Sequence, residues 1–104
     1  PSELLESKKM RDVIEMLEKD YDILLFDCPP VVGISDPLII TKYVNTTVVV
    51  ASYKTTPTDM LKKTVKALEA VNARIAGIII NKAPSGGNGY YGKYYGDYYN
   101  SYYE

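Results

Sequence analysis

The stretch I-L-L-F-D-C-P-P, residues 23–30, decides the fold predicted for this chain. Four consecutive apolar residues without polar alternation predict a strand over 23–26 that is buried on both faces of a parallel sheet. The two prolines end this strand, because proline cannot donate to a sheet ladder. Asp27 therefore emerges at the carboxyl end of the strand, which is where open parallel sheets bind their ligands.

The rest of the body alternates between helix and strand signals, which is typical of an α/β fold with a parallel sheet and flanking helices. A helix is expected to begin with Ser2 as its N-cap, and another with Asp36 as its cap. The same ligand rule directs attention to the loop after Ser52 and to Asn81. The predicted helices are 2–20, 36–43 and 58–71, and the further buried strands are 46–52 and 76–81.

Composition excludes several classes of function. The chain has 104 residues, no histidine, one cysteine and a net charge of −1. His-based triads, the usual zinc sites and an internal disulfide framework are therefore excluded. No basic nucleic-acid surface is indicated, so no nucleic-acid partner is expected. No apolar run approaches the ~20 residues of a membrane-spanning helix.

Tyrosine divides the chain into two parts. Eight of the 11 tyrosines lie in residues 90–104, and almost no aliphatic residue follows Lys82. We expect a folded body over 1–82 and a flexible, low-complexity tail over 83–104. The tail is either a phospho-acceptor cluster or a sticky segment that self-associates by stacking, and composition alone leaves these readings level. Its paired tyrosines are Tyr90, Tyr91, Tyr94, Tyr95, Tyr98, Tyr99, Tyr102 and Tyr103.

The aspartate after the apolar run has two interpretations. It can be the carboxylate of a Walker B element, which holds Mg²⁺, usually through water, beside a nucleotide phosphate. It can equally be a strand-ending residue that caps the next turn. The bare pattern does not separate the two.

The neighbouring residues favour the first interpretation through a resemblance. The segment from Tyr21 to Asp36, with D-C-P-P at 27–30, resembles the D-T-P-P segment of the deviant Walker P-loop ATPases. The opening P-S-E-L-L-E-S of residues 1–7 and the C-terminal tyrosine cluster resemble one family of that group, the bacterial protein-tyrosine kinases of capsule and exopolysaccharide synthesis. Cys28 departs from the Thr or Ser of the family and is a weaker hydrogen-bonding group.

The resemblance implies an ATP-dependent autokinase. It implies that Asp27 is catalytic and binds Mg²⁺, and that Asn81 contacts the adenine, although an asparagine that merely turns the chain is about as plausible. It implies phosphorylation of the tyrosine cluster in trans within a ring-like homo-oligomer. It also implies a transmembrane adaptor of the polysaccharide co-polymerase type, a cognate tyrosine phosphatase, and a place at the cytoplasmic face of the plasma membrane.

The resemblance further implies that the chain is the C-terminal half of the catalytic domain, a partial P-loop NTPase fold. The Walker A and A′ elements of the family precede the opening motif, so the 104 residues alone are expected to be inactive. Residues 87–93 fit G-x-x-x-x-G-K, but Tyr94 replaces the Ser or Thr that binds Mg²⁺, and no apolar helix follows. The alternatives are a partition-type or septum-placing deviant Walker ATPase and a non-enzymatic interaction module.

Overall fold

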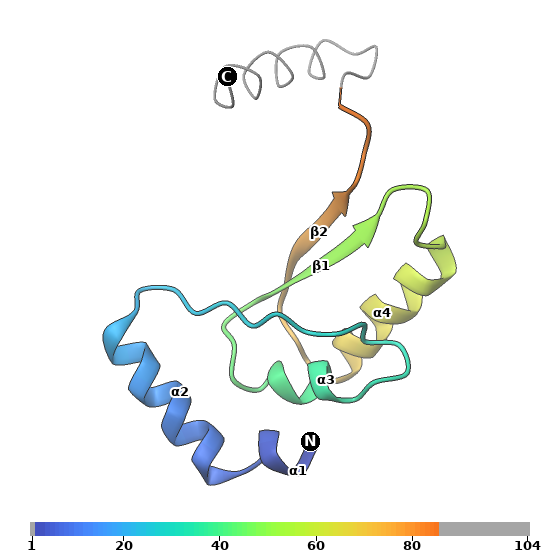
Figure 1. Cartoon of the computed structure of the whole chain (residues 1–104). Helices are drawn as coiled ribbons and strands as arrows, with labels where there is room; N and C mark the ends of the chain where they lie inside the picture. The colour runs from blue at the N-terminus through green and yellow to red at the C-terminus, as the bar shows by residue number, and fades with distance from the viewer. Residues whose placement is uncertain (1, 86–104) are drawn as a thin grey trace, which may run out of the picture.

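The computed structural model describes residues 2–85. It shows an α/β arrangement in which a two-stranded parallel sheet is accompanied by helices (Figure 1). The tyrosine cluster and the G-x-x-x-x-G-K pattern lie outside the described residues. In chain order the elements are α1 (Ser2–Leu5), α2 (Lys8–Asp20), α3 (Asp36–Ile40), β1 (Thr47–Ser52), α4 (Thr58–Ala70) and β2 (Ile75–Asn81).

The sheet is one β–α–β unit. β1 and β2 run parallel, with Val49 opposite Ile78 and Ser52 opposite Asn81, and α4 connects them. β-Branched residues dominate both strands, which favours an extended backbone. The prediction of two parallel strands joined by a helix over these residues is confirmed, and no boundary differs by more than one residue.

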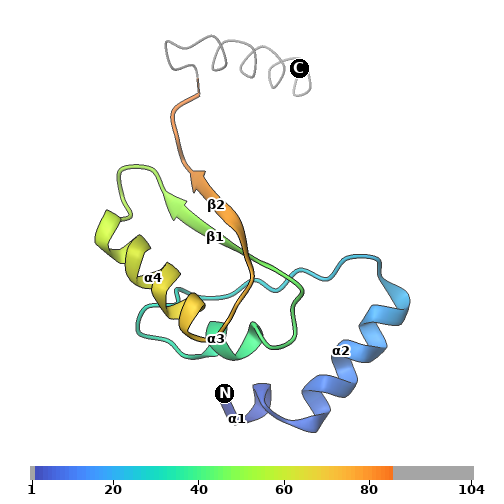
Figure 2. The same ribbon diagram turned by 180° about the vertical axis from the view of Figure 1, so that it is seen from behind.

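The few buried apolar side chains of the described residues come from α2 (Ile14), α3 (Ile40), β1 and α4. Leu68 of α4 is 1% exposed, and Val49 and Ala51 of β1 are buried. The residues between them on β1, Val48 and Val50, are exposed, so only one face of the strand is covered. Both views place α4 beside the strands (Figures 1 and 2). Burial of alternate residues is the signature of a strand with a single covered face.

The expectation of a buried strand over 76–81 is wrong. β2 is extended as predicted, but its isoleucines at 78, 79 and 80 are about half exposed. A parallel strand is buried on both faces only when helices or further strands lie against it. Within the described residues, β1 is the sole neighbour of β2 in the sheet.

The predicted N-terminal helix is divided in two. Ser7 has an extended backbone, and its side chain accepts a hydrogen bond from the Met10 amide at 3.2 Å, so Ser7 rather than Ser2 is the side-chain cap of α2. The Ser7 hydroxyl also donates to the Leu4 carbonyl oxygen at 2.6 Å. One serine therefore closes α1 and begins α2, which is why a single continuous helix does not form.

The residues before α3 form no strand. Residues 21–30 are a coil, and both views show the segment between α2 and α3 crossing the sheet instead of running alongside it (Figures 1 and 2). The predicted strand over 23–26 is therefore wrong for the described structure. An apolar run becomes a strand only when a neighbour accepts its backbone hydrogen bonds, and neither β1 nor β2 does so here.

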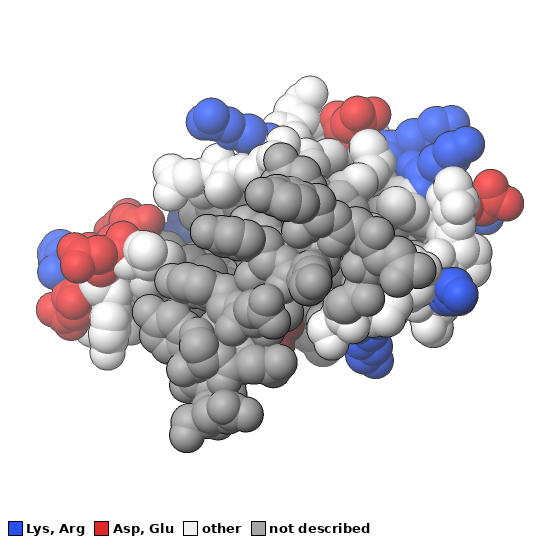
Figure 3. Space-filling view, turned by 90° about the horizontal axis from the view of Figure 1, so that it is seen from above, with Lys and Arg blue, Asp and Glu red and all other residues white. Residues whose placement is uncertain are grey.

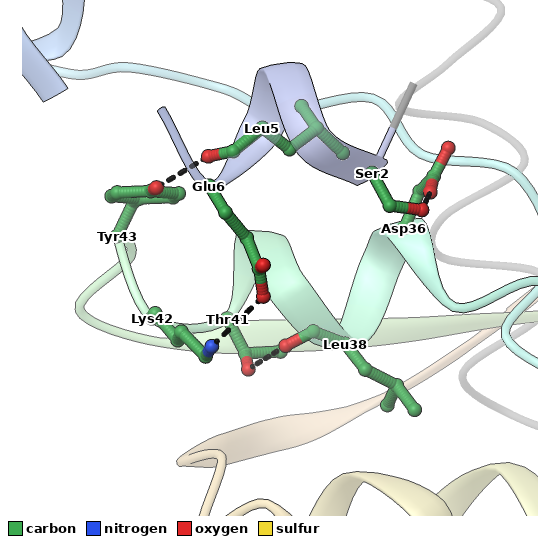
Figure 4. A network of polar contacts seen from close by, with 8 residues as sticks. All are labelled: Ser2, Leu5, Glu6, Asp36, Leu38, Thr41, Lys42 and Tyr43. Carbon is green, nitrogen blue, oxygen red and sulfur yellow. Dashed lines mark hydrogen bonds and ion pairs between the residues drawn. The ribbon is translucent and has the colours of Figure 1, made fainter. Parts of the chain in front are cut away.

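Polar contacts hold α1 against α3 and the turn that follows it (Figure 4). The Ser2 hydroxyl donates to the Asp36 carboxylate at 3.0 Å. The Tyr43 hydroxyl donates to the Leu5 carbonyl oxygen, and the Lys42 ammonium lies 3.4 Å from the Glu6 carboxylate. These contacts join positions more than thirty residues apart in the sequence.

Asp36 is not the cap of α3. The N-cap position belongs to Ser35, which makes no side-chain capping bond, and Asp36 is the first helical residue, followed by the expected Pro37. Its carboxylate is used instead to bind the Ser2 hydroxyl of α1. α3 ends at Ile40, three residues earlier than predicted, and irregular turns continue to Tyr43.

Candidate functional site

The carboxyl ends of the two strands bring two of the predicted site segments together. The Tyr53 amide donates to the Asn81 carbonyl oxygen at 2.8 Å, which joins the loop after β1 to the last residue of β2. The loop is also held internally, because the Ser52 amide donates to the Thr56 hydroxyl at 2.9 Å. This confirms that Asn81 and the loop after Ser52 share one edge of the sheet.

The Asn81 side chain is exposed and points its carbonyl oxygen back at the chain. Its Oδ1 accepts a hydrogen bond from the Lys82 amide at 2.9 Å. This bond fixes the carboxamide plane and leaves its NH₂ group free to donate within residues 2–85. A carboxamide with a free donor can recognise the acceptor nitrogens of a purine base.

Two lysines beside Asn81 were missed by the sequence reasoning. Lys54 and Lys82 each follow a strand end, and their φ angles of 56° and 58° lie in the left-handed region. The Lys54 ammonium also lies 5.5 Å from the Tyr53 ring centroid, which is within cation–π range. Non-glycine residues in this conformation cost about 1–2 kcal/mol each. The sequence does not predict these positive φ angles, because lysine rarely adopts them.

Asp27 makes no hydrogen bond to this edge within the described residues. It is exposed in the coil between α2 and α3, and its carboxylate forms neither a hydrogen bond nor an ion pair with any residue in 2–85. The structure therefore brings Asn81 and the loop after Ser52 together but does not join Asp27 to them.

The Asp27 carboxylate affects the pKa of the neighbouring Cys28 thiol. Partial burial raises the pKa of the Cys28 thiol, and the negative charge of the Asp27 carboxylate raises it further. The thiol donates to the Phe26 carbonyl oxygen at a sulfur–oxygen distance of 3.7 Å. Cys28 is thus held in its neutral form and is not an activated nucleophile.

The donor set at Asp27 fits a magnesium ion only as one ligand among several. No group of three His, Cys, Asp or Glu side chains capable of holding a metal occurs within the described residues. Mg²⁺ commonly keeps several waters and takes one or two carboxylates together with substrate phosphates. A single unpaired carboxylate such as Asp27 suits that mode of binding.

Acidic and basic side chains are mixed on the face of the molecule that is seen from above (Figure 3). α2 carries four basic and four acidic residues, and α4 carries three basic and two acidic ones. The α4 cations are Lys62, Lys63 and Lys66. No helix in the described region is long and apolar enough to span a bilayer.

Two relatives of this chain are named as tyrosine-protein kinases. No family model matches the chain. The tyrosine-protein kinase Ptk of Acinetobacter johnsonii is 33% identical over 90 residues, covering 86% of this chain and 12% of Ptk. A putative tyrosine-protein kinase in the cps region of Klebsiella pneumoniae is 32% identical over 92 residues, covering 88% of this chain and 13% of that protein.

A solved structure agrees with these relatives. The kinase domain of VpsO matches with a TM-score of 0.74 and 30% identity, over 81% of this chain and 41% of the VpsO chain. The chain belongs with the bacterial tyrosine-protein kinases. The α/β architecture is accordingly that of part of a kinase domain of this type. The chain spans only about an eighth of the curated kinases it matches.

Proposed function

We propose that this chain forms the C-terminal part of an ATP-dependent protein-tyrosine kinase domain that autophosphorylates its own tyrosine cluster. The observation that carries the proposal is the match to the VpsO kinase domain, with a TM-score of 0.74 and 30% identity. The name tyrosine-protein kinase, borne by Ptk and its Klebsiella counterpart, supports the same reaction. A partition-type ATPase gains no comparable support from these names.

In this proposal each site residue has a distinct role. Asp27 binds Mg²⁺ of the Mg–ATP complex and helps orient the attacking tyrosine hydroxyl. Asn81 positions the adenine through its free carboxamide donor, since its Oδ1 is already bonded to the Lys82 amide. The ammonium groups of Lys54 and Lys82 add positive charge at the same edge, which favours an anionic ligand. In this proposal residues 1–82 form part of the kinase body, and the tail over residues 83–104 is its substrate.

The reaction moves the terminal phosphoryl group of ATP to a tyrosine oxygen. The bond between that phosphorus and the bridging β–γ oxygen breaks, a bond to the phenol oxygen forms, and the phenol proton leaves. Because phosphoryl transfer has a loose transition state, the enzyme needs mainly to position and to stabilise charge. A carboxylate on the metal serves both requirements.

The proposed acceptors are the eight tyrosines of the C-terminal cluster, Tyr90 to Tyr103. Each phosphate adds about −1.5 to −2 charges, so full modification gives the tail about −12 to −16. Such a tail repels its copies, which would loosen a ring of subunits phosphorylating one another in trans. The proposal includes this ring, a cognate tyrosine phosphatase that resets it, and a role in capsule or exopolysaccharide synthesis.

A membrane partner completes the proposal. We place the kinase at the cytoplasmic face of the plasma membrane, held by a transmembrane adaptor of the polysaccharide co-polymerase type or by a fused membrane domain. The support is the name of the Klebsiella relative, which places it in a cps region, and the name EpsB of another relative, from Ralstonia nicotianae.

The experiment is labelling with Mg–ATP. The complete gene product that contains this chain is incubated with Mg–ATP, and phosphotyrosine is mapped by mass spectrometry. The proposal predicts phosphate on residues within 90–103. Nucleotide hydrolysis without any phosphotyrosine in that cluster would favour a partition-type ATPase, and no nucleotide binding at all would favour an interaction module.

A further inference from the structure

Tyr43 differs from the other tyrosines of the body in how its hydroxyl is used. Residues 2–85 contain Tyr21, Tyr43 and Tyr53, and within them the Tyr43 hydroxyl alone forms a hydrogen bond. It donates to the Leu5 carbonyl oxygen of α1 from the irregular turn after α3, and the Tyr43 side chain is half-buried there (Figure 4). One phenol oxygen thus joins the opening helix to a turn 38 positions further along the chain.

The surroundings of this hydroxyl suit a hydrogen-bond donor and oppose an anion. The Leu5 carbonyl oxygen can only accept a hydrogen bond. The following residue, Glu6, turns its carboxylate toward the same turn, where the Lys42 ammonium lies 3.4 Å from it (Figure 4). A phosphorylated Tyr43 oxygen has no proton to donate to Leu5, and its phosphate adds about −1.5 to −2 charges one residue away from Glu6. The phosphate also competes with Glu6 for Lys42, so modification weakens two of the contacts that hold α1.

α1 can leave α3 without disturbing the rest of the body. It has four residues, and none of them is buried. The polar contacts that hold its segment are the Tyr43 bond, the bond from Ser2 to Asp36, and the ion pair between Glu6 and Lys42. The ion pair is exposed to solvent and therefore contributes little. Segments with few buried apolar contacts open locally far more often than a whole domain unfolds. Each opening exposes the Tyr43 hydroxyl in an irregular turn, where a second protein molecule can reach it.

We propose that Tyr43 is a phosphorylation site outside the C-terminal tyrosine cluster, and that its phosphate releases α1 from α3. The inference rests on the proposed function, because a second copy of the same kinase supplies the phosphoryl group from Mg–ATP. The bond between the terminal phosphorus and the bridging oxygen of ATP breaks, a bond to the Tyr43 oxygen forms, and the phenol proton leaves to solvent. The modified oxygen cannot donate to Leu5 again. α1 therefore stays open until a phosphatase hydrolyses the phosphate ester.

The first test is the position of the phosphate. The complete gene product that contains this chain is incubated with Mg–ATP, and each phosphotyrosine is assigned by mass spectrometry. We expect phosphate on Tyr43 as well as within residues 90–103. Ser2→Ala removes the hydroxyl bound to Asp36 and so opens α1 more often. It should raise the initial rate of Tyr43 labelling about fivefold, the effect of one lost hydrogen bond, and leave labelling of residues 90–103 unchanged.

The second test measures the release of α1. Phosphotyrosine is incorporated at Tyr43 of the complete gene product through an expanded genetic code, so this test needs no kinase activity. Hydrogen exchange is followed at the amides of Glu6 and Ser7, which are bonded to carbonyl oxygens of α1. It should become at least about tenfold faster, because the phosphate removes one bond and adds repulsion. Phosphotyrosine at Tyr53 is the matched control and should leave this exchange unchanged, since the Tyr53 hydroxyl forms no hydrogen bond within residues 2–85.

The outcomes separate this inference from the proposed function. Labelling within residues 90–103 without phosphate on Tyr43 overturns the inference and leaves the kinase proposal in place. Exchange at Glu6 and Ser7 that phosphotyrosine at Tyr43 does not accelerate, or that phosphotyrosine at Tyr53 accelerates equally, overturns the release of α1 whatever the labelling shows. The absence of phosphotyrosine from the whole protein overturns the proposed function, and this inference falls with it.

Discussion

Tyr43→Phe should loosen α1 without unfolding the sheet. The substitution removes the hydroxyl that donates to the Leu5 carbonyl oxygen, a partly buried bond between positions 38 residues apart. A bond of this kind contributes about 1 kcal/mol net, which corresponds to roughly a fivefold change in an opening equilibrium. The ring itself is retained, so packing changes little.

The assay is hydrogen exchange at the amides of Glu6 and Ser7, which are bonded to the Ser2 and Leu4 carbonyl oxygens of α1. Tyr43→Phe should speed their exchange about fivefold. Glu6→Gln is the comparison, because it breaks only the exposed ion pair to Lys42, whose side chains are 65% and 55% exposed. Such pairs contribute about 0–1 kcal/mol. A larger effect of Glu6→Gln than of Tyr43→Phe would refute the reasoning.

Three further outcomes are expected. Leu68→Ala should lower the free energy of unfolding in urea by about 2–5 kcal/mol, because the Leu68 side chain is 1% exposed. Leu4→Ala is the control and should change this free energy little, because Leu4 is 65% exposed. Equal effects of the two substitutions would contradict the assigned core. Iodoacetamide should modify Cys28 slowly near pH 7.5, because burial and the Asp27 charge raise the thiol pKa. Asp27→Asn should shift the pH dependence of Cys28 alkylation to lower pH, because it removes the negative charge that raises the thiol pKa. An unchanged pH dependence would contradict the proximity of the Asp27 carboxylate to the Cys28 thiol. The 104-residue chain alone should turn over no ATP, since Asp27 by itself cannot position a triphosphate; measurable turnover would contradict this.

The parts of the fold that local sequence determines were predictable. The β-branched run of β1 and the apolar stripe of α4 each carry their signal within a few residues, and both elements form as predicted. The proline after Asp36 likewise marked the beginning of α3. In these cases the periodicity of the residues matches the periodicity of the structure.

The failures concern interactions between distant positions. The run over 23–26 has the composition of a strand, but a strand also needs a pairing neighbour, which no local pattern reports. Aspartate is a common helix-capping residue, yet the Asp36 carboxylate binds the Ser2 hydroxyl 34 positions away. Ser7 was passed over because a serine within an apolar-periodic segment does not reveal whether it caps or continues a helix.

The site was predictable to the same extent. Asn81 and the loop after Ser52 lie at one edge because both follow strands whose parallel pairing the sequence predicts. The roles of Asp27, Asn81 and the tyrosine cluster stay predictions. The sequence pattern did not indicate Lys54 and Lys82 as site residues. Their left-handed backbone is imposed by the turns after the two strands.

The most direct measurement of the central claim is the phosphotyrosine content of residues 90–103 in the complete gene product incubated with Mg–ATP, compared between Asp27→Asn and Asp22→Asn. Both aspartates are exposed in the same coil, so the pair isolates the role of one carboxylate. The account predicts that Asp27→Asn lowers labelling by on the order of 100-fold or more, the loss expected for a group on the catalytic metal, while Asp22→Asn retains it. Equal labelling of the two variants would contradict the account.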